Sequence, residues 1–254
     1  MIDIHSHILP GIDDGPKDEQ GSINMAIEAV EQGITAVVAT PHHKNRTFDN
    51  DAESIEKNTS IFQNLLNEKG IPLTVFPGQE TRIHGSMVEG LEEGTILPLN
   101  HTNYVHVEMP SDSVPRYAQQ LLYDMQRAGY IPIIVHPERN RDFLRDPQLL
   151  YTLVQNGALT QVTAASLLGK FGKEMERFSH QIIEANLTHF IASDAHNNTT
   201  RNNVLADALE HINQTFGIDD YYMFIENAEC IVSGRPVHQM EPQPIKRKKF
   251  LGLF

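Results

Sequence analysis

The sequence predicts an α/β barrel of parallel strands covered by helices. The chain has 254 residues, a length at which α/β barrels commonly form one domain. Short runs rich in β-branched residues alternate with stretches of helical spacing along the whole chain. Seven such repeats suit a closed or nearly closed (β/α)7 barrel better than two small domains, although length alone allows both.

The candidate strands are short apolar runs in which β-branched and aromatic residues dominate. They lie at residues 2–5, 34–40, 73–77, 104–108, 131–135, 159–163 and 189–193. Because helical patterns separate these runs, we expect neighbouring strands to be parallel.

The helical stretches place apolar residues three and four positions apart. Four of them stop at a glycine, as helices often do: Gly33, Gly70, Gly129 and Gly157. Two more helical stretches have their apolar residues at 178–183 and 204–212. A C-terminal helix is expected to carry Cys230. Each predicted strand thus has helices to cover it.

One barrel domain is expected over residues 1–245, because no Gly/Ser/Pro-rich linker divides the chain. Residues 246–254 form a short tail that joins a basic run, KRKK, to apolar residues. A solvated tail is the favoured interpretation. The alternative is a weak contact with an anionic membrane surface or an acidic partner.

Composition excludes several classes of protein. A formal charge of −13 argues against binding to a nucleic-acid backbone, which depends on cationic contacts to phosphate. No apolar run approaches the ~18 residues of a membrane span, and the first residues lack a signal-peptide pattern, so we expect a cytoplasmic protein. One Cys beside 13 His excludes internal disulfides and favours metal or acid–base chemistry.

Potential metal ligands follow the predicted strands. Each one alone is a weak signal, because a strand-end His is more often merely hydrogen-bonded. The carboxyl ends of barrel strands meet at one face, however, so the coincidence favours a shared metal site. The candidate ligands are His5, His7, Asp14, His42, Glu80, Glu108, His136, Asp194 and His196.

These side chains exceed the three protein ligands typical of one catalytic zinc. We therefore expect two or three ions, with a carboxylate such as Glu80 as a bridge. Imidazoles and carboxylates without a thiolate suit Mn, Fe or Zn. Adjacent ions of this kind activate a shared water and clamp both oxygens of an in-line displacement, as in phosphate-ester hydrolysis.

Two arginines fit that chemistry. Arg139 lies three residues after His136, and Arg201 lies five after His196. Guanidinium groups bind phosphoryl oxygens in a bidentate way, so both are candidate phosphate-binding residues. The alternative is a solvent-facing arginine paired with a neighbouring acid such as Glu138.

The single cysteine does not fit a thiol-dependent phosphatase. Those enzymes use C-x5-R, whereas four residues separate Cys230 from Arg235. Cys230 is therefore expected to be a packed or solvent-facing thiol, and any phosphotyrosine hydrolysis should proceed directly to water. His43 is a candidate proton donor, but an indirect or solvent-facing role is favoured.

Six motifs resemble those of the PHP (polymerase and histidinol phosphatase) superfamily: HSHILPGIDDGP, TPHH, PGQE, VEMP, HPER and SDAH. Within it, the chain is similar to the CpsB-type tyrosine phosphatases of bacterial capsule and exopolysaccharide operons. The resemblance covers essentially the whole chain, and HSHILPGIDDGP is specific to this branch. It implies a distorted, TIM-like barrel of seven strands (the PHP fold) and a trinuclear, usually manganese-dependent site.

The resemblance also implies how the ligands are shared among three ions. One ion takes His5, His7, Glu80 and Asp194, the second takes Glu80, Glu108 and His136, and the third takes Asp14, His42 and His196. Arg139 and Arg201 match phosphate-binding arginines. Thr163 stands where asparagine is expected, and it is not a metal ligand.

We therefore expect a metal-dependent protein tyrosine phosphatase that uses a metal-bridging hydroxide and three Mn²⁺ ions, with Fe or Zn as alternatives. Its expected substrates are phosphotyrosine proteins, among them a bacterial tyrosine kinase of capsule or exopolysaccharide synthesis and the substrates of that kinase. The kinase partnership rests on the resemblance alone. Alternatives are another PHP phosphoesterase, such as a histidinol-phosphate phosphatase or a nuclease, and a non-catalytic, metal-stabilised kinase regulator.

Overall fold

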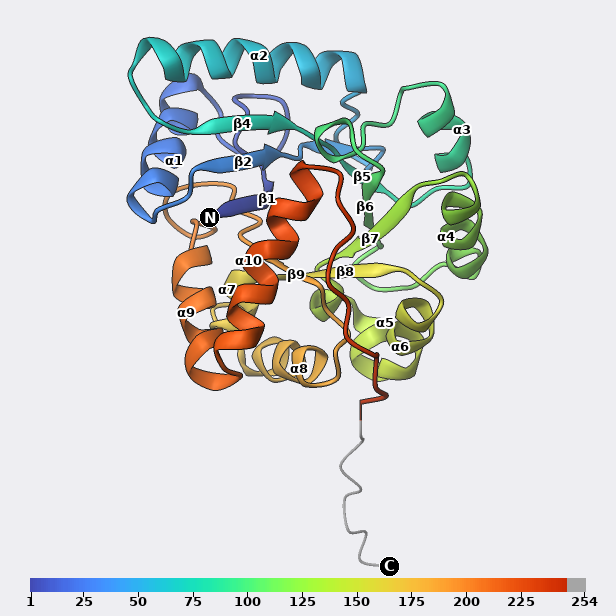
Figure 1. Ribbon diagram of the computed structural model, residues 1–254. Coiled ribbons are helices and arrows are strands. Elements are labelled where there is room, and N and C mark those ends of the chain that lie inside the picture. Colours follow the sequence, from blue (N-terminus) through green and yellow to red (C-terminus); the bar gives the residue numbers. More distant parts are fainter. Residues whose placement is uncertain (246–254) are drawn as a thin grey trace, which may run out of the picture.

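The computed structural model describes residues 1–245, so the expected tail at 246–254 lies outside the described residues. Parallel strands form the centre of the molecule, with helices outside them (Figure 1). The strands are β1 (Ile2–Ser6), β2 (Ala36–Ala39), β3 (His42–His43), β4 (Thr74–Pro77), β5 (Glu80–Arg82), β6 (Tyr104–Glu108), β7 (Ile131–Val135), β8 (Leu159–Thr163) and β9 (Phe190–Ala192).

The hydrogen-bonded order is β1-β2-β4 in one sheet and β3-β5-β6-β7-β8-β9 in the other. Two residues separate β2 from β3 and β4 from β5, and β3 pairs with β5 as β2 pairs with β4. Each couple therefore forms one interrupted strand, which gives seven in all. On the other side, the amide of His7 donates to the carbonyl of Ala195, and that of Asp194 to the carbonyl of His5, both at 2.9 Å. These bonds join β9 to β1 and confirm the predicted barrel.

The second and third predicted strands differ from the structure at their ends. The runs at 34–40 and 73–77 stop before His42 and Glu80, whereas the structure resumes each strand there as β3 and β5. Pro41 has no amide hydrogen for the ladder, and Gly78 lies where the backbone comes close to other side chains. These interruptions place His42 and Glu80 beside each other in register.

The helices are α1 (Glu19–Glu31), α2 (Ala52–Glu68), α3 (Met87–Glu92), α4 (Ala118–Arg127), α5 (Arg141–Arg145), α6 (Pro147–Gln155), α7 (Ala164–Leu167), α8 (Lys173–Glu184), α9 (Leu205–Thr215) and α10 (Ile218–Val232). The glycines predicted to end four of them, Gly33, Gly70, Gly129 and Gly157, all have positive φ. Helices α3, α5 and α7 were not predicted, because they are too short to show a helical period. No helix among residues 1–245 combines the length and the apolar character needed to cross a membrane.

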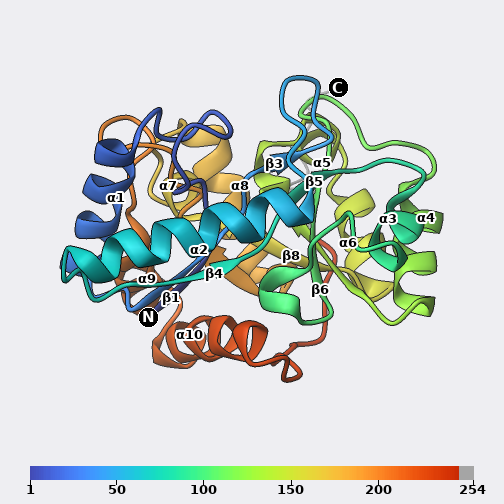
Figure 2. The ribbon, with the colours of Figure 1, turned by 90° about the horizontal axis from the view of Figure 1, so that it is seen from above.

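The barrel interior is apolar at the end where the strands begin. Ile4, Tyr104 and Phe190 are fully or almost fully buried there with Ile231 of α10. Figure 2 shows α10 crossing this end of the barrel. Cys230 is buried on the same helix, as expected for a packed thiol, and the carboxyl ends of the strands lie at the opposite end.

Gly78 is expected to be essential to the interruption of the third strand. A Cβ atom at this position would lie 2.6 Å from Cγ1 of Val38 and 2.9 Å from Cδ2 of Leu99. Gly78→Ala should therefore lower the free energy of unfolding by about 1–3 kcal/mol, measured by urea denaturation. The control is Gly85→Ala, because Gly85 is exposed and a Cβ there meets no atom within 4 Å. Equal stability of the two variants would contradict this account.

Candidate metal centre

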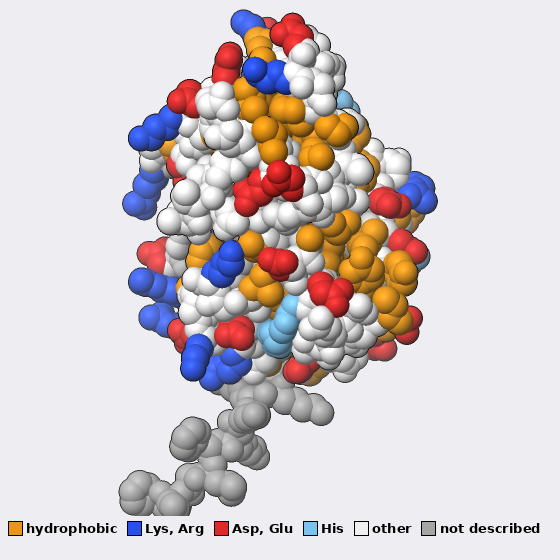
Figure 3. Space-filling view, turned by 90° about the vertical axis from the view of Figure 1, so that its left-hand side faces the viewer, with side chains coloured by type: hydrophobic (Ala, Val, Ile, Leu, Met, Phe, Trp, Pro, Cys, Tyr) orange, Lys and Arg blue, Asp and Glu red, His pale blue; other side chains and the backbone are white. Residues whose placement is uncertain are grey.

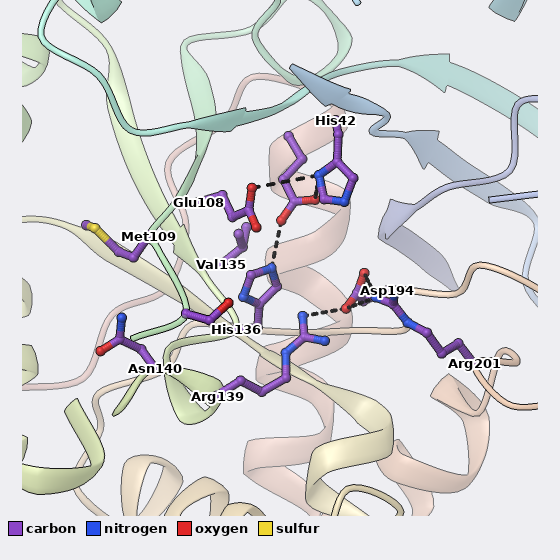
Figure 4. Close-up of a pocket in the computed structure, with 11 residues that line it drawn as sticks. His42, Glu108, Met109, Val135, His136, Arg139, Asn140, Asp194 and Arg201 are labelled. Carbon is purple, nitrogen blue, oxygen red and sulfur yellow. Dashed lines mark hydrogen bonds and ion pairs between the residues drawn. The ribbon is translucent and has the colours of Figure 1, made fainter. Parts of the chain in front are cut away.

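A pocket of about 190 Å³ opens at the carboxyl ends of the strands (Figure 4). Its lining combines predicted ligands, both predicted arginines and several uncharged residues. The lining residues are His42, Glu80, Glu108, Met109, Ser111, Val135, His136, Arg139, Asn140, Asp194 and Arg201.

Three groups of side chains beside this pocket have the spacing of metal ligands, with one donor atom from each residue within 4.8 Å of the others. Seven of the nine predicted ligands belong to these groups. Of the other two, His136 contacts Glu80, and Asp194 lies beside the imidazoles of His5, His7 and His196. The groups are His7, Asp14, His42 and His196; His5, His7 and Glu80; and His42, Glu80 and Glu108.

Glu80 is the centre of the arrangement. Its Oε2 atom lies 3.5 Å from Nε2 of His5, 3.3 Å from Nε2 of His7 and 2.8 Å from Nδ1 of His42. Its Oε1 atom lies 2.7 Å from Nε2 of His136. A single buried carboxylate thus faces four imidazoles, which is the geometry expected of a bridging ligand.

Both predicted arginines converge on Asp194. Arg139 donates to Oδ2 of Asp194 at 2.5 Å, and Arg201 donates to the same oxygen at 3.2 Å. Arg201 also reaches Oδ2 of Asp14 at 3.5 Å. Neither arginine pairs with Glu138, the alternative partner, whose carboxylate accepts instead from the hydroxyl of Ser166. The arginines therefore face the candidate metal centre and the pocket.

Two residues that the sequence analysis missed orient the imidazoles. Nδ1 of His7 lies 2.7 Å from Oδ2 of Asp13, and Nδ1 of His5 lies 2.9 Å from Oε1 of Gln161. In each ring the opposite nitrogen is left facing Glu80, as metal-binding histidines commonly require. The adjacent acid in the GIDDG loop was the available signal for Asp13, whereas Gln161 depends on a contact across the barrel.

Arg82 is a third residue that the sequence analysis missed. Its guanidinium lies 2.8 Å from Oε1 of Glu108 and donates to the carbonyl of Met109 at 3.1 Å. One oxygen of Glu108 is thereby held, and the other remains directed toward His42 at 3.7 Å. His43 lies elsewhere: it is buried against Asp49 at 3.0 Å, outside the pocket lining, which agrees with an indirect role.

Two site residues have a left-handed backbone, which side chains other than glycine rarely adopt. His136 has φ of 38° and Asp194 has φ of 52°, each directly or shortly after a strand. Such strain is concentrated at functional sites, where the surrounding structure holds it in place.

The buried charges suit a cation. Burial opposes ionisation of Glu80, yet the imidazoles of His42 and His5 hold its pKa well below the ordinary value. Burial lowers the pKa of His136 and His196 to about 4, so both rings are neutral near pH 7. Ionised carboxylates and neutral imidazoles are the protonation states in which these groups bind metal.

Two other groups lie in a negatively charged environment that shifts their pKa values. Burial and the charge of Glu80 raise the pKa of Glu108 to about 7. Burial opposes protonation of His7, but Asp13 raises its pKa well above the ordinary value. A divalent cation would favour the ionised carboxylate and the neutral ring in these two places.

Several buried polar atoms here contact one another or Asp14 only as ion pairs and make no hydrogen bond within residues 1–245, so they remain available to a metal ion. The atoms are Nδ1 of His42, Oε2 of Glu80, Oε2 of Glu108 and Nε2 of His196. All four belong to predicted ligands. The residues present therefore fit a metal centre.

Comparisons with known proteins agree with the predicted family. The family model for capsular polysaccharide synthesis proteins, CpsB/CapC, matches residues 1–233. The tyrosine-protein phosphatase YwqE of Bacillus subtilis is 48% identical over 254 residues, with both chains fully covered. The putative tyrosine-protein phosphatase CapC of Staphylococcus aureus is 37% identical, again with both chains fully covered.

The fold agrees as well. A crystal structure from work on YwqE of Bacillus subtilis and CpsB of Streptococcus pneumoniae, described as unique metal-dependent tyrosine phosphatases, superposes with a TM-score of 0.95. The superposition covers 97% of this chain and 100% of that one, at 48% identity. The chain therefore belongs to the CpsB/CapC family of capsular polysaccharide synthesis proteins.

Proposed function

We propose that this chain is a metal-dependent protein tyrosine phosphatase. The observation that carries the proposal is the pocket in which Arg139 and Arg201 face the same carboxylate, Asp194, beside three groups of potential ligands. Relatives named as tyrosine phosphatases, which this chain matches over 100% and 98% of their lengths, support the same function.

The proposed ions are three Mn²⁺, with Fe or Zn as alternatives, held by the nine predicted ligands. Imidazole and carboxylate donors without a thiolate suit these metals. When bound, such ions lower the pKa of a coordinated water and neutralise charge on phosphoryl oxygens. Glu80 would be shared between ions, since its two oxygens face different imidazoles.

The protein's own residues then bind and orient the substrate. Arg139 and Arg201 would hold phosphoryl oxygens through paired N–H donors and stabilise the charge that spreads over them. Tyrosine has a pKa of ~10, so its phenolate leaves more readily than a serine alkoxide and depends less on a general acid. This agrees with the position of His43, outside the pocket lining.

The distribution of charge supports an anionic substrate. Lys17, Lys44, Arg46, Lys170 and Arg201 lie in segments that follow strands at the carboxyl end of the barrel. Figure 3 shows lysines and arginines gathered along the left edge of the molecule, which is this end. Lys44 and Arg201 pair with Asp49 and Asp14 of these segments, so these cations offset part of the negative charge where a phosphate dianion would bind.

The proposed partners are phosphotyrosine proteins, among them a bacterial tyrosine kinase of capsule synthesis, as the family's role suggests. We further propose that residues 1–245 act as one catalytic barrel domain. The basic tail at 246–254 would make only an auxiliary contact with an acidic partner or a membrane surface.

Turnover of a phosphotyrosyl peptide in Mn²⁺ should be lost on chelation with EDTA and restored by adding the metal. Cys230→Ser is the control and should keep full activity, because the thiol is buried on α10. Activity that survives chelation would contradict the metal mechanism. Faster turnover of histidinol phosphate than of the peptide would favour another phosphoesterase.

A further inference from the structure

We propose that Met109, Ser111, Val135 and Asn140 form a preformed wall that receives the leaving group of the substrate. The inference rests on the proposed function and specifies where the aryl ring of phosphotyrosine lies. We call these four residues the leaving-group wall. They line the same pocket as the ligands and the arginines.

The wall is the uncharged side of the pocket. The other lining residues are imidazoles, carboxylates and guanidinium groups, which suit the phosphoryl group and its cations. In Figure 4, Met109 and Asn140 lie on the opposite side of His136 and Arg139 from Asp194 and Arg201. The aryl ring of the substrate is neutral, so it can be buried against uncharged residues without needing a charged partner.

Asn140 has no hydrogen-bonding capacity left for a ligand. Its amide nitrogen donates to the carbonyls of Pro110 at 2.7 Å and Ser113 at 3.1 Å. Its amide oxygen accepts from the backbone amides of Asp142 at 2.9 Å and Phe143 at 3.1 Å. Two donors and two acceptor positions are the full capacity of an asparagine side chain. Asn140 therefore offers the substrate a surface rather than a polar contact.

The same bonds make the wall rigid. Besides the two from Asn140, the amide of Arg141 donates to the carbonyl of Ser111 at 3.0 Å. The amide of Val114 donates to Oδ2 of Asp142, also at 3.0 Å. The segment from Pro110 to Val114 is thus fixed to the start of α5, and little ordering cost remains when a ligand binds.

The chemistry of the wall favours an aromatic ring. Met109 and Val135 supply apolar surface, which suits the ring of a phenolate leaving group. An apolar cavity of ~150 Å³ holds one benzene ring. A pocket of about 190 Å³ therefore admits a phosphoryl group with part of its ring, and the exposed Ser111 lies where the wall reaches the protein surface.

The test is a bulky substitution at the exposed residue of the wall, Ser111→Trp. We expect KM for a phosphotyrosyl peptide to rise about tenfold, because the indole would occupy the path of the peptide. Inhibition by inorganic phosphate, which needs only the phosphoryl site, should change less than about twofold. The matched control is Ser86→Trp. Both serines are exposed, neither hydroxyl makes a hydrogen bond within residues 1–245, and Ser86 does not line the pocket.

Two results would overturn the leaving-group wall while the wild type hydrolyses the peptide. One is an unchanged KM in Ser111→Trp. The other is an equal change in KM and in inhibition by phosphate, which would place Ser111 at the phosphoryl site. A wild type that hydrolyses no phosphotyrosyl peptide would instead refute the proposed function, and the wall with it.

Discussion

Replacing Glu80 by glutamine is expected to lower the turnover of a phosphotyrosyl peptide at least ~10³-fold, a loss of about 4 kcal/mol in transition-state stabilisation. Glu80 belongs to two of the three ligand groups, and its oxygens face four imidazoles. Glutamine keeps the shape but loses the charge, and its NH₂ group cannot bind a cation. The protein should also lose more than one equivalent of metal, measured by elemental analysis after dialysis.

A graded control separates a bridging role from a simple charge effect. Glu108 belongs to one ligand group, so Glu108→Gln should lose less metal than Glu80→Gln. Glu89 is exposed on α3, and Glu89→Gln should match the wild type. Circular dichroism would verify that each variant is folded. A Glu80→Gln protein that keeps its full metal content and activity within tenfold would contradict the bridging role.

The barrel could be predicted from the sequence because its strands are buried runs of apolar residues. The predicted bounds at 104–108, 131–135 and 159–163 match β6, β7 and β8 residue for residue. Strands β3 and β5 were missed because they are two and three residues long and are rich in polar side chains. These segments are strands because β3 forms a parallel ladder with β5, and β5 forms one with β6, and their own composition does not indicate this.

The candidate site could be predicted as a set of residues, but its contacts could not. The expected ligands gather because parallel strands end at one face. That both arginines meet at Asp194 depends on the left-handed backbone of Asp194 and on the path of its loop. The pairing of His5 with Gln161 joins residues 156 positions apart, and no local pattern encodes it. Whether the nine residues bind metal stays a prediction that chelation and the Glu80 variant test.

Replacing Arg139 by lysine is expected to lower kcat/KM for the phosphotyrosyl peptide about 10²-fold while the metal content stays unchanged. Lysine keeps the positive charge but loses the planar fork that binds two phosphoryl oxygens together. Inhibition by inorganic phosphate should weaken at the same time, because Arg139 lines the pocket as well as contacting Asp194. Arg139→Ala, which also removes the charge, should lose about 10³-fold.

Arg82 offers a control that distinguishes phosphate binding from the orientation of a ligand. Like Arg139, it is a partly buried arginine paired with a predicted ligand, Glu108 at 2.8 Å, but it does not line the pocket. Arg82→Lys keeps the charge beside Glu108, so it should cost about tenfold in activity and leave inhibition by phosphate unchanged. If both lysine variants lost activity equally, with phosphate inhibition intact, Arg139 would act by holding Asp194. A selective loss of phosphate inhibition in Arg139→Lys would instead mark its guanidinium as the group that binds the phosphoryl oxygens.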